Sequence, residues 1–178
     1  ITYYNRNPDK DVATCRKWAE QRVEVINYAL RGIPPDRVRF HVCYSFDMAP
    51  RVGDMEFADI IDVVLKINAG GYSFENANPR HEHEWRLWRS HRLAEGKVII
   101  PGTIGISSVV VEHPDLVAER IVRLAELVGR ENIIASVDCG FATLADTDDI
   151  HPSIAWAKLD ALVEGARRAS DQLWKRRA

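Results

Sequence analysis

The segment Arg37-Val-Arg-Phe-His-Val-Cys-Tyr44 is the point from which the fold of this 178-residue chain can be predicted. It is rich in β-branched and aromatic residues and predicts a strand over Val38–Tyr44. Side chains two residues apart in a strand project from the same face, so His41 and Cys43 should point in one direction. An imidazole and a thiolate side by side are donors that suit zinc. The segment therefore predicts part of a metal site, whose other ligands must come from elsewhere in the chain.

Helical and strand-like patterns alternate along the rest of the sequence. Before the first strand, apolar residues recur at helical spacing from Asp11 to Leu30, and after it residues 45–55 predict a polar loop. Strands that alternate with helices favour a parallel sheet with helices packed outside it. The remaining predicted elements are a helix at 57–65, a strand at 72–75, a loop and helix at 78–88, a strand at 97–104, a helix at 114–128, a strand at 132–137 and a helix at 152–174.

The predicted element order is a helix followed by four βα units, which is half of a TIM-type (βα)8 barrel. Half a barrel has two strand edges without partners. We therefore predict an α/β half-barrel in a single domain spanning residues 1–178, completed by another segment or another chain, or by a homo-oligomer. The alternative is an open α/β sheet.

The composition is that of a soluble globular protein. Charged residues make up 28% and hydrophobic residues 46%, with a net charge of −2. Because there is no basic stripe and no long apolar run, neither nucleic acid nor membrane is an expected partner. An odd number of widely spaced cysteines favours a reducing, cytoplasmic location. The chain starts without a signal-peptide pattern or an initiator Met, which suggests a fragment or a processed chain.

Residues with metal-binding side chains end three of the four predicted strands. His41 and Cys43 end the first strand, Glu75 ends the second and Cys139 follows the fourth. The carboxyl ends of parallel strands meet at one edge of a sheet, so these residues can converge into a set of one nitrogen, two sulfur and one oxygen donors. Each of them alone also fits an ordinary core position. Cys15, on the apolar stripe of a helix, is predicted to be core.

These motifs resemble the zinc site of the cobalamin-independent methionine synthases. The resemblance rests on His41-Val-Cys43, on Tyr72-Ser-Phe-Glu75 and on Asp138-Cys139-Gly140, and it covers essentially the whole chain. It matches the second half of the catalytic barrel of that family. The stretch from Gly70 to Trp85 resembles the shorter single-barrel members, which include the epoxyalkane:coenzyme M transferases. The resemblance implies that a Zn²⁺ cofactor is held by His41, Cys43, Glu75 and Cys139.

The resemblance also implies an activity. Zinc would favour the thiolate form of a small thiol substrate such as homocysteine, which then takes a methyl or other alkyl group from a methylfolate, a methylcorrinoid or an epoxide. Alternatives are the addition of a coenzyme M-type thiol to an epoxide, a non-catalytic structural zinc site, and a zinc-free binding domain. Methionine synthases carry a histidine after the third strand, whereas Thr103-Ile-Gly-Ile-Ser-Ser108 has none.

Further residues around the predicted site have expected roles. Glu75 is the hardest of the four ligands and the one expected to give up its position to a substrate thiol, and Asp138 beside Cys139 is a second candidate for a catalytic or supporting role. The predicted substrate contacts are Ser73, Arg80, His81 and His83. For the segment after the second strand, the alternative is a solvated loop that caps a helix.

Overall fold

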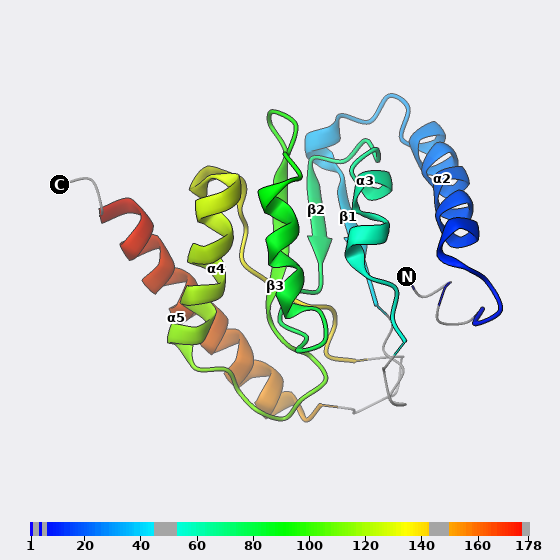
Figure 1. The fold of residues 1–178 in the computed structure, drawn as a ribbon. Helices are drawn as coiled ribbons and strands as arrows, with labels where there is room; N and C mark the ends of the chain where they lie inside the picture. Colours follow the sequence, from blue (N-terminus) through cyan, green and yellow to red (C-terminus); the bar gives the residue numbers. More distant parts are fainter. Residues whose placement is uncertain (2–3, 5–6, 45–52, 143–149, 176–178) are drawn as a thin grey trace.

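Four parallel strands form one sheet, in the order in which they occur along the chain. The computed structural model describes residues 1, 4, 7–44, 53–142 and 150–175. Helices separate the strands (Figure 1), which confirms the α/β class and the four βα units predicted from the sequence. The strands are β1 (Arg39–Val42), β2 (Gly71–Phe74), β3 (Val98–Ile104) and β4 (Ser136–Val137).

The helices differ in length and in type. Three are long α-helices: α2 (Val12–Ala29) before β1, α4 (Pro114–Val128) between β3 and β4, and α5 (Pro152–Lys175) at the end. The others are the one-turn helix α3 (Ile61–Val64) and the 3₁₀ helices η1 (Pro35–Arg37), η2 (Phe57–Asp59), η3 (Glu82–Arg89) and η4 (Arg130–Asn132).

Three predicted elements take a different form in the structure. The helix expected at 57–65 is divided into η2 and α3, and the segment at 78–88 forms η3, because local turns there replace a full α-helical register. The strand expected at 132–137 is reduced to Ser136–Val137 and one bridge between Ile99 and Ile133, since the pairing of β3 with β4 shifts register. Most of the predicted loop at 45–55 lies outside the described residues.

The long helices begin and end where their sequences indicate. Asp11 caps α2 by accepting a 2.7 Å hydrogen bond from the backbone N–H of Thr14. At the start of α4, His113 is the cap and Pro114 occupies the first turn. Gly129, with φ of 93°, ends α4 because this left-handed conformation suits glycine.

Two apolar clusters hold the helices against the sheet. One joins α2, α3 and η3 to β1 and β2, and it includes Cys15, whose predicted core position is confirmed. The other packs α4 and α5 against Ile104 of β3. The sheet is therefore supported along its length by helices, while its strand ends are left to the connecting loops.

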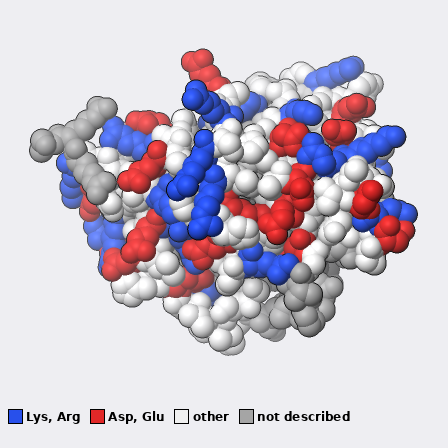
Figure 2. Space-filling view, viewed as in Figure 1, with Lys and Arg blue, Asp and Glu red and all other residues white. Residues whose placement is uncertain are grey.

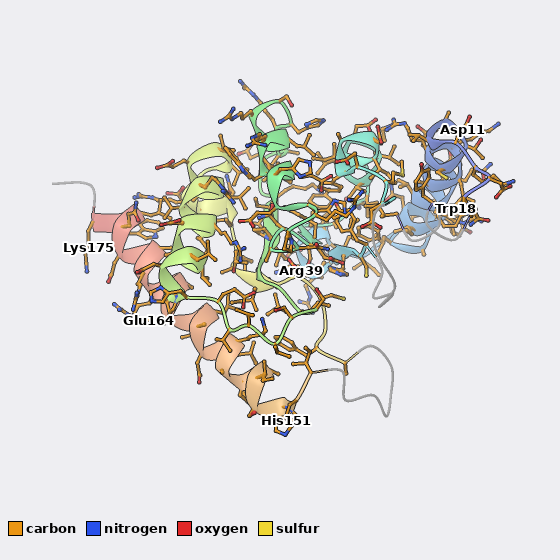
Figure 3. All side chains as sticks on the ribbon, turned by 60° about the horizontal axis from the view of Figure 1, so that its bottom comes forward. Asp11, Trp18, Arg39, His151, Glu164 and Lys175 are labelled. Carbon is orange, nitrogen blue, oxygen red and sulfur yellow. The ribbon has the colours of Figure 1, made fainter. Side chains whose placement is uncertain are left out.

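The two outer strands, β1 and β4, lie at opposite sides of the sheet. Figure 1 places α2 beyond α3 at the end of the molecule nearer to β1, and α5 at the other end. In Figure 3 the molecule is turned so that the end to which the strands point comes forward, and α5 runs along one side of it from His151 to Lys175. The carboxyl ends of the strands thus share one end of the molecule.

Charged residues are mixed over the surface. Lys and Arg are interspersed with Asp and Glu on the face drawn in Figure 2, in agreement with the small net charge. Within the residues that the structure describes, no helix combines the length and the apolar composition needed to cross a bilayer.

Candidate metal centre

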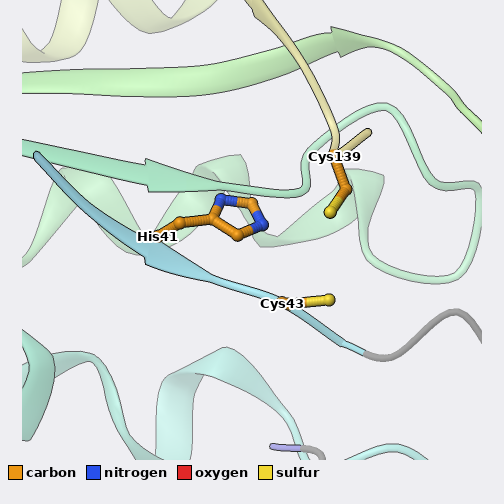
Figure 4. A group of neighbouring side chains, drawn as sticks. All are labelled: His41, Cys43 and Cys139. Carbon is orange, nitrogen blue, oxygen red and sulfur yellow. The ribbon is translucent and has the colours of Figure 1, made fainter. Parts of the chain in front are cut away.

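The strand ends bring one histidine and two cysteines together. His41 lies on β1, Cys43 follows that strand directly, and Cys139 comes two residues after β4. One ligand atom from each lies within 4.8 Å of the other two (Figure 4). A tetrahedral zinc ion, with bonds of about 2.0–2.3 Å, holds its donors roughly 3.5–3.8 Å apart. Small side-chain adjustments therefore suffice for these three residues to bind a metal ion.

The imidazole of His41 is held in position by β2. His41 and Ser73 are partners in the parallel register, and Nδ1 of the ring lies 2.9 Å from Oγ of Ser73. This contact leaves Nε2 available on the side where Figure 4 shows the thiols of Cys43 and Cys139. Burial lowers the pKa of His41, although the negative charge of Glu75 partly opposes this shift. The neutral ring is the form that binds metals.

Glu75 lies beside these three residues but is not one of the group. It is buried, its Oε1 accepts a 2.9 Å hydrogen bond from the backbone N–H of Tyr44, and its Oε2 accepts one of 3.2 Å from the Asn78 amide. Both oxygens therefore have protein partners in this structure. The role of Glu75 as a metal ligand stays a prediction, and it is compatible with these hydrogen bonds because each carboxylate oxygen has a second lone pair.

Asp138 fixes the end of β4 against the segment that follows β2. Its buried Oδ1 accepts hydrogen bonds from the backbone N–H groups of Asn76 at 2.8 Å and Ala77 at 2.9 Å. Burial raises the pKa of Asp138 to about 7, although these two N–H groups pull it down. Since Asp138 and Asn76 are neighbours of Cys139 and Glu75, this contact sets the distance between two predicted ligands.

Gly102 of β3 makes room for this carboxylate. A Cβ atom at Gly102 would lie 1.9 Å from Oδ1 of Asp138 and 2.5 Å from its Cα, so a larger residue requires the end of β4 to move. The glycine is needed because the backbone of β4 approaches β3 closely at this point.

The predicted substrate contacts occupy different environments. His81 is 1% exposed and lies between two carboxylates, so it is part of the protein interior. Arg80 is at the surface with Nε 3.8 Å from Asp54, and His83 is exposed with Nε2 3.4 Å from Glu56. Ser73 faces His41. Contacts of these residues with a substrate stay predictions.

A second group of possible ligands consists of Glu56, His83 and Glu84. In this group the oxygens of Glu84 already accept hydrogen bonds, from the hydroxyl of Tyr44 and from the backbone N–H of Phe57. Glu84 also pairs with the buried ring of His81, and Glu56 and His83 are exposed, so we do not assign a metal site there.

The sequence reading missed the residues that surround the predicted ligands. Tyr44 and Asn78 hold Glu75, and Asp54 and Glu84 hold His81, although none of the four was singled out. One signal was available: Tyr44 directly follows Cys43 in an apolar strand, where a tyrosine hydroxyl needs a buried partner. Asp54 gave no such signal, because it lies within the predicted polar loop at 45–55.

Comparison with solved structures finds the same fold in a known protein. A B12-independent methionine synthase from Shewanella sp. W3-18-1, solved in complex with selenomethionine, superposes with a TM-score of 0.70. The match covers 86% of this chain and 44% of the synthase chain, at 19% identity. This chain has the fold of about half a methionine synthase barrel. The half-barrel predicted from the element order is confirmed.

The sequence comparison leads to a related enzyme. The chain is 25% identical to 2-hydroxypropyl-CoM lyase of Xanthobacter autotrophicus over 89% of its own length, which is 46% of the lyase. No family model matches the sequence. The predicted resemblance to the methionine synthase group and its coenzyme M-linked members is thus confirmed as a distant relationship. The half-barrel spans slightly less than half the length of both relatives, and both relatives are enzymes.

Proposed function

We propose that this half-barrel carries the zinc site of an enzyme that transfers an alkyl group to a thiol. The observation that carries the proposal is the convergence of His41, Cys43 and Cys139 at the carboxyl end of the sheet, in the fold of methionine synthase. Two thiolates and one imidazole are a donor set that favours zinc over harder or smaller cations. Bound zinc supplies positive charge that keeps a substrate thiol in its nucleophilic thiolate form.

The residues of the chain divide the work around that ion. Ser73 fixes the ring of His41, so that Nε2 remains directed to the ligand position. Asp138 keeps the strand ends carrying Cys139 and Glu75 together. Glu75 would be the fourth donor to the ion, and as the hardest of the four ligands it would be the one to yield its place to a substrate sulfur. In the reaction, a carbon–sulfur bond forms and the bond between that carbon and its leaving group breaks.

The first candidate reaction is methyl transfer to homocysteine or a similar thiol. The second is the making or breaking of a bond between a coenzyme M-type thiol and a hydroxyalkyl group, which the match to 2-hydroxypropyl-CoM lyase favours. We propose cytoplasmic enzyme chemistry on small molecules for both candidates, with neither nucleic acid nor membrane as partner.

An assay with several donors distinguishes these reactions. The zinc-loaded complete assembly, this chain together with the half-barrel that completes it, is incubated with homocysteine and a methyl donor, and separately with coenzyme M and an epoxide, and the thioether product is measured by mass spectrometry. We expect one of these products to form, and to disappear in Cys139→Ala. A protein that binds zinc tightly but makes neither product would indicate the structural alternative instead.

We also propose that a second half-barrel completes the sheet. The outer strands β1 and β4 each have one partner among the described strands. Large apolar side chains are exposed on the two flanking helices: Val25 and Tyr28 on α2, and Trp156 and Val163 on α5. An exposed apolar flank beside an open strand edge is a surface that proteins normally cover.

The oligomeric state of the purified chain tests this completion. We expect the chain to associate with a second half-barrel, supplied by a longer polypeptide, a partner chain or another copy. Sedimentation of the chain alone and after mixing with the candidate partner measures this directly. A stable monomer that neither self-associates nor binds a partner would contradict the proposal.

A further inference from the structure

His81 lies at the centre of a buried cluster next to the candidate metal centre. Its Nδ1 is 3.1 Å from Oε2 of Glu84, and its Nε2 is 3.0 Å from Oδ2 of Asp54. The ring stacks on Tyr44, with centroids 3.7 Å apart and planes inclined by 28°. The hydroxyl of Tyr44 donates a 2.6 Å hydrogen bond to the same oxygen of Glu84. All four side chains are buried.

The partners of His81 determine its charge. An ionised carboxylate can only accept hydrogen bonds, so a ring with a carboxylate at each nitrogen must donate from both. With both carboxylates ionised, His81 is an imidazolium between Glu84 and Asp54 and both contacts are charge-assisted. Such a ring cannot bind a metal, because neither nitrogen has a free lone pair. Its effect on the site must be indirect.

Tyr44 connects this cluster to the predicted ligands. Its backbone N–H donates a 2.9 Å hydrogen bond to Oε1 of Glu75, and its peptide is joined to Cys43. The ring of Tyr44 is fully buried and is fixed on one face by His81 and at its hydroxyl by Glu84. A displacement of Tyr44 as a whole moves both the Cys43 backbone and the donor that orients the Glu75 carboxylate.

We propose that His81 is a positioning residue for the candidate metal centre and that it acts through Tyr44 on Cys43 and Glu75. The proposal rests on the proposed function, since it assumes that these residues bind a metal. Outer partners of metal ligands typically change metal affinity by about 10–100-fold when they are removed. A residue that only stabilises the fold would leave affinity and coordination unchanged in the molecules that remain folded.

The experiment measures metal binding rather than turnover. His81→Phe retains a ring that can stack on Tyr44 and removes both N–H donors. Tyr44→Phe removes only the hydroxyl. For each purified chain, the visible spectrum with Co²⁺ reports the coordination geometry, and competition with a chelator gives the Zn²⁺ affinity. We expect His81→Phe to bind Zn²⁺ about tenfold or more weakly and to alter the Co²⁺ bands, with a smaller change of the same kind in Tyr44→Phe.

His91→Phe is the matched control, because this ring also hydrogen-bonds to its own segment, through Nδ1 to the carbonyl of Leu87, and lies outside the site. Its affinity and spectrum should equal those of the wild type. Folded His81→Phe and Tyr44→Phe chains with wild-type affinity and spectrum would overturn the positioning role alone. If His81→Phe does not fold, Tyr44→Phe decides. A wild-type chain that binds neither metal would overturn the proposed zinc site as well.

Discussion

Two histidines, one on β1 and one in the segment after β2, have opposite environments. His41 is partly exposed, has a serine at one nitrogen and faces two thiols with the other. His81 is buried and has a carboxylate at each nitrogen. The first environment leaves a lone pair free for a metal, whereas the second places a proton on both nitrogens.

The difference teaches that residue type alone does not locate a metal site. Both histidines lie in motifs with neighbouring metal-binding side chains, and the sequence predicts His41 as a metal ligand and His81 as a substrate contact. The hydrogen-bond partners of the two ring nitrogens decide between a ligand and a buried cation. A hydroxyl partner leaves the ring neutral, whereas a carboxylate at each nitrogen favours the cation. The predictions below test this contrast, from the largest expected effect to the smallest.

Removing a thiol from the His41 environment should have the largest effect. In Cys43→Ala or Cys139→Ala the metal loses one of the donors that the structure brings together. We expect the Zn²⁺ affinity to fall by more than about 100-fold, beyond the range for outer partners. Competition with a chromophoric chelator measures this change.

Cys15→Ala is the control for these variants, because Cys15 is the one cysteine of the sequence outside the candidate site and lies buried on α2, in the apolar cluster. It should bind Zn²⁺ as the wild type does, with a small loss of thermal stability. Equal loss of affinity in all three variants would indicate a general effect of cysteine removal and would contradict the assignment of the site.

Ser73→Ala tests the feature that distinguishes His41 from His81. Without the hydroxyl, Nδ1 loses its partner and the ring can rotate away from the thiols. We expect about tenfold weaker Zn²⁺ binding. Ser90→Ala, which removes a hydroxyl bonded to the Leu87 carbonyl at the end of η3, should have no effect on affinity. Unchanged binding in Ser73→Ala would mean that packing alone orients His41.

The fold was accessible from the sequence because its signals are local. Alternating helical and strand-like patterns predicted the four units, and Pro114 and Gly129 marked the ends of α4. The strand at 132–137 was overestimated, since its length depends on pairing with β3, which shifts register and leaves only Ser136–Val137. Pairing between distant segments leaves no local pattern in a single sequence.

The candidate site could be predicted from the sequence to the same extent. His41, Cys43 and Cys139 were predicted because the ends of parallel strands meet whatever the details of the loops. The partners were not: the contact of Asp138 with the Asn76 and Ala77 backbone, and that of His81 with Asp54, depend on how the loops fold. The sequence could not separate a ligand histidine from a buried cation, because that distinction is made by residues remote in the chain.

The charge of His81 leads to a last prediction, which concerns the pH dependence of the unfolding free energy. Burial would lower the pKa of His81, but the hydrogen bonds and charges of Glu84 and Asp54 outweigh it and raise the pKa above its ordinary value. The pKa of Glu84 is lowered, because bonds from His81, Tyr44 and Phe57 outweigh its own burial. Because the pKa of His81 is higher in the folded than in the unfolded state, its bound proton stabilises the fold. This contribution is complete below about pH 6.5 and is lost as the pH rises through the pKa of the folded state.

The lowered pKa of Glu84 has the opposite pH dependence. Its contribution to stability is present above about pH 4.3 and is lost as the pH falls through the pKa of the folded state. Urea unfolding of the wild type and His81→Phe across pH 5–9 measures the contribution of His81 together with its coupled partners Glu84 and Asp54, because groups remote from this cluster contribute equally to both chains. We expect the wild-type advantage in unfolding free energy to be largest below about pH 6.5 and to decline toward alkaline pH. A difference that stays constant over this range would mean that His81 carries no titrating proton, and the contrast with His41 would then be one of burial rather than of charge.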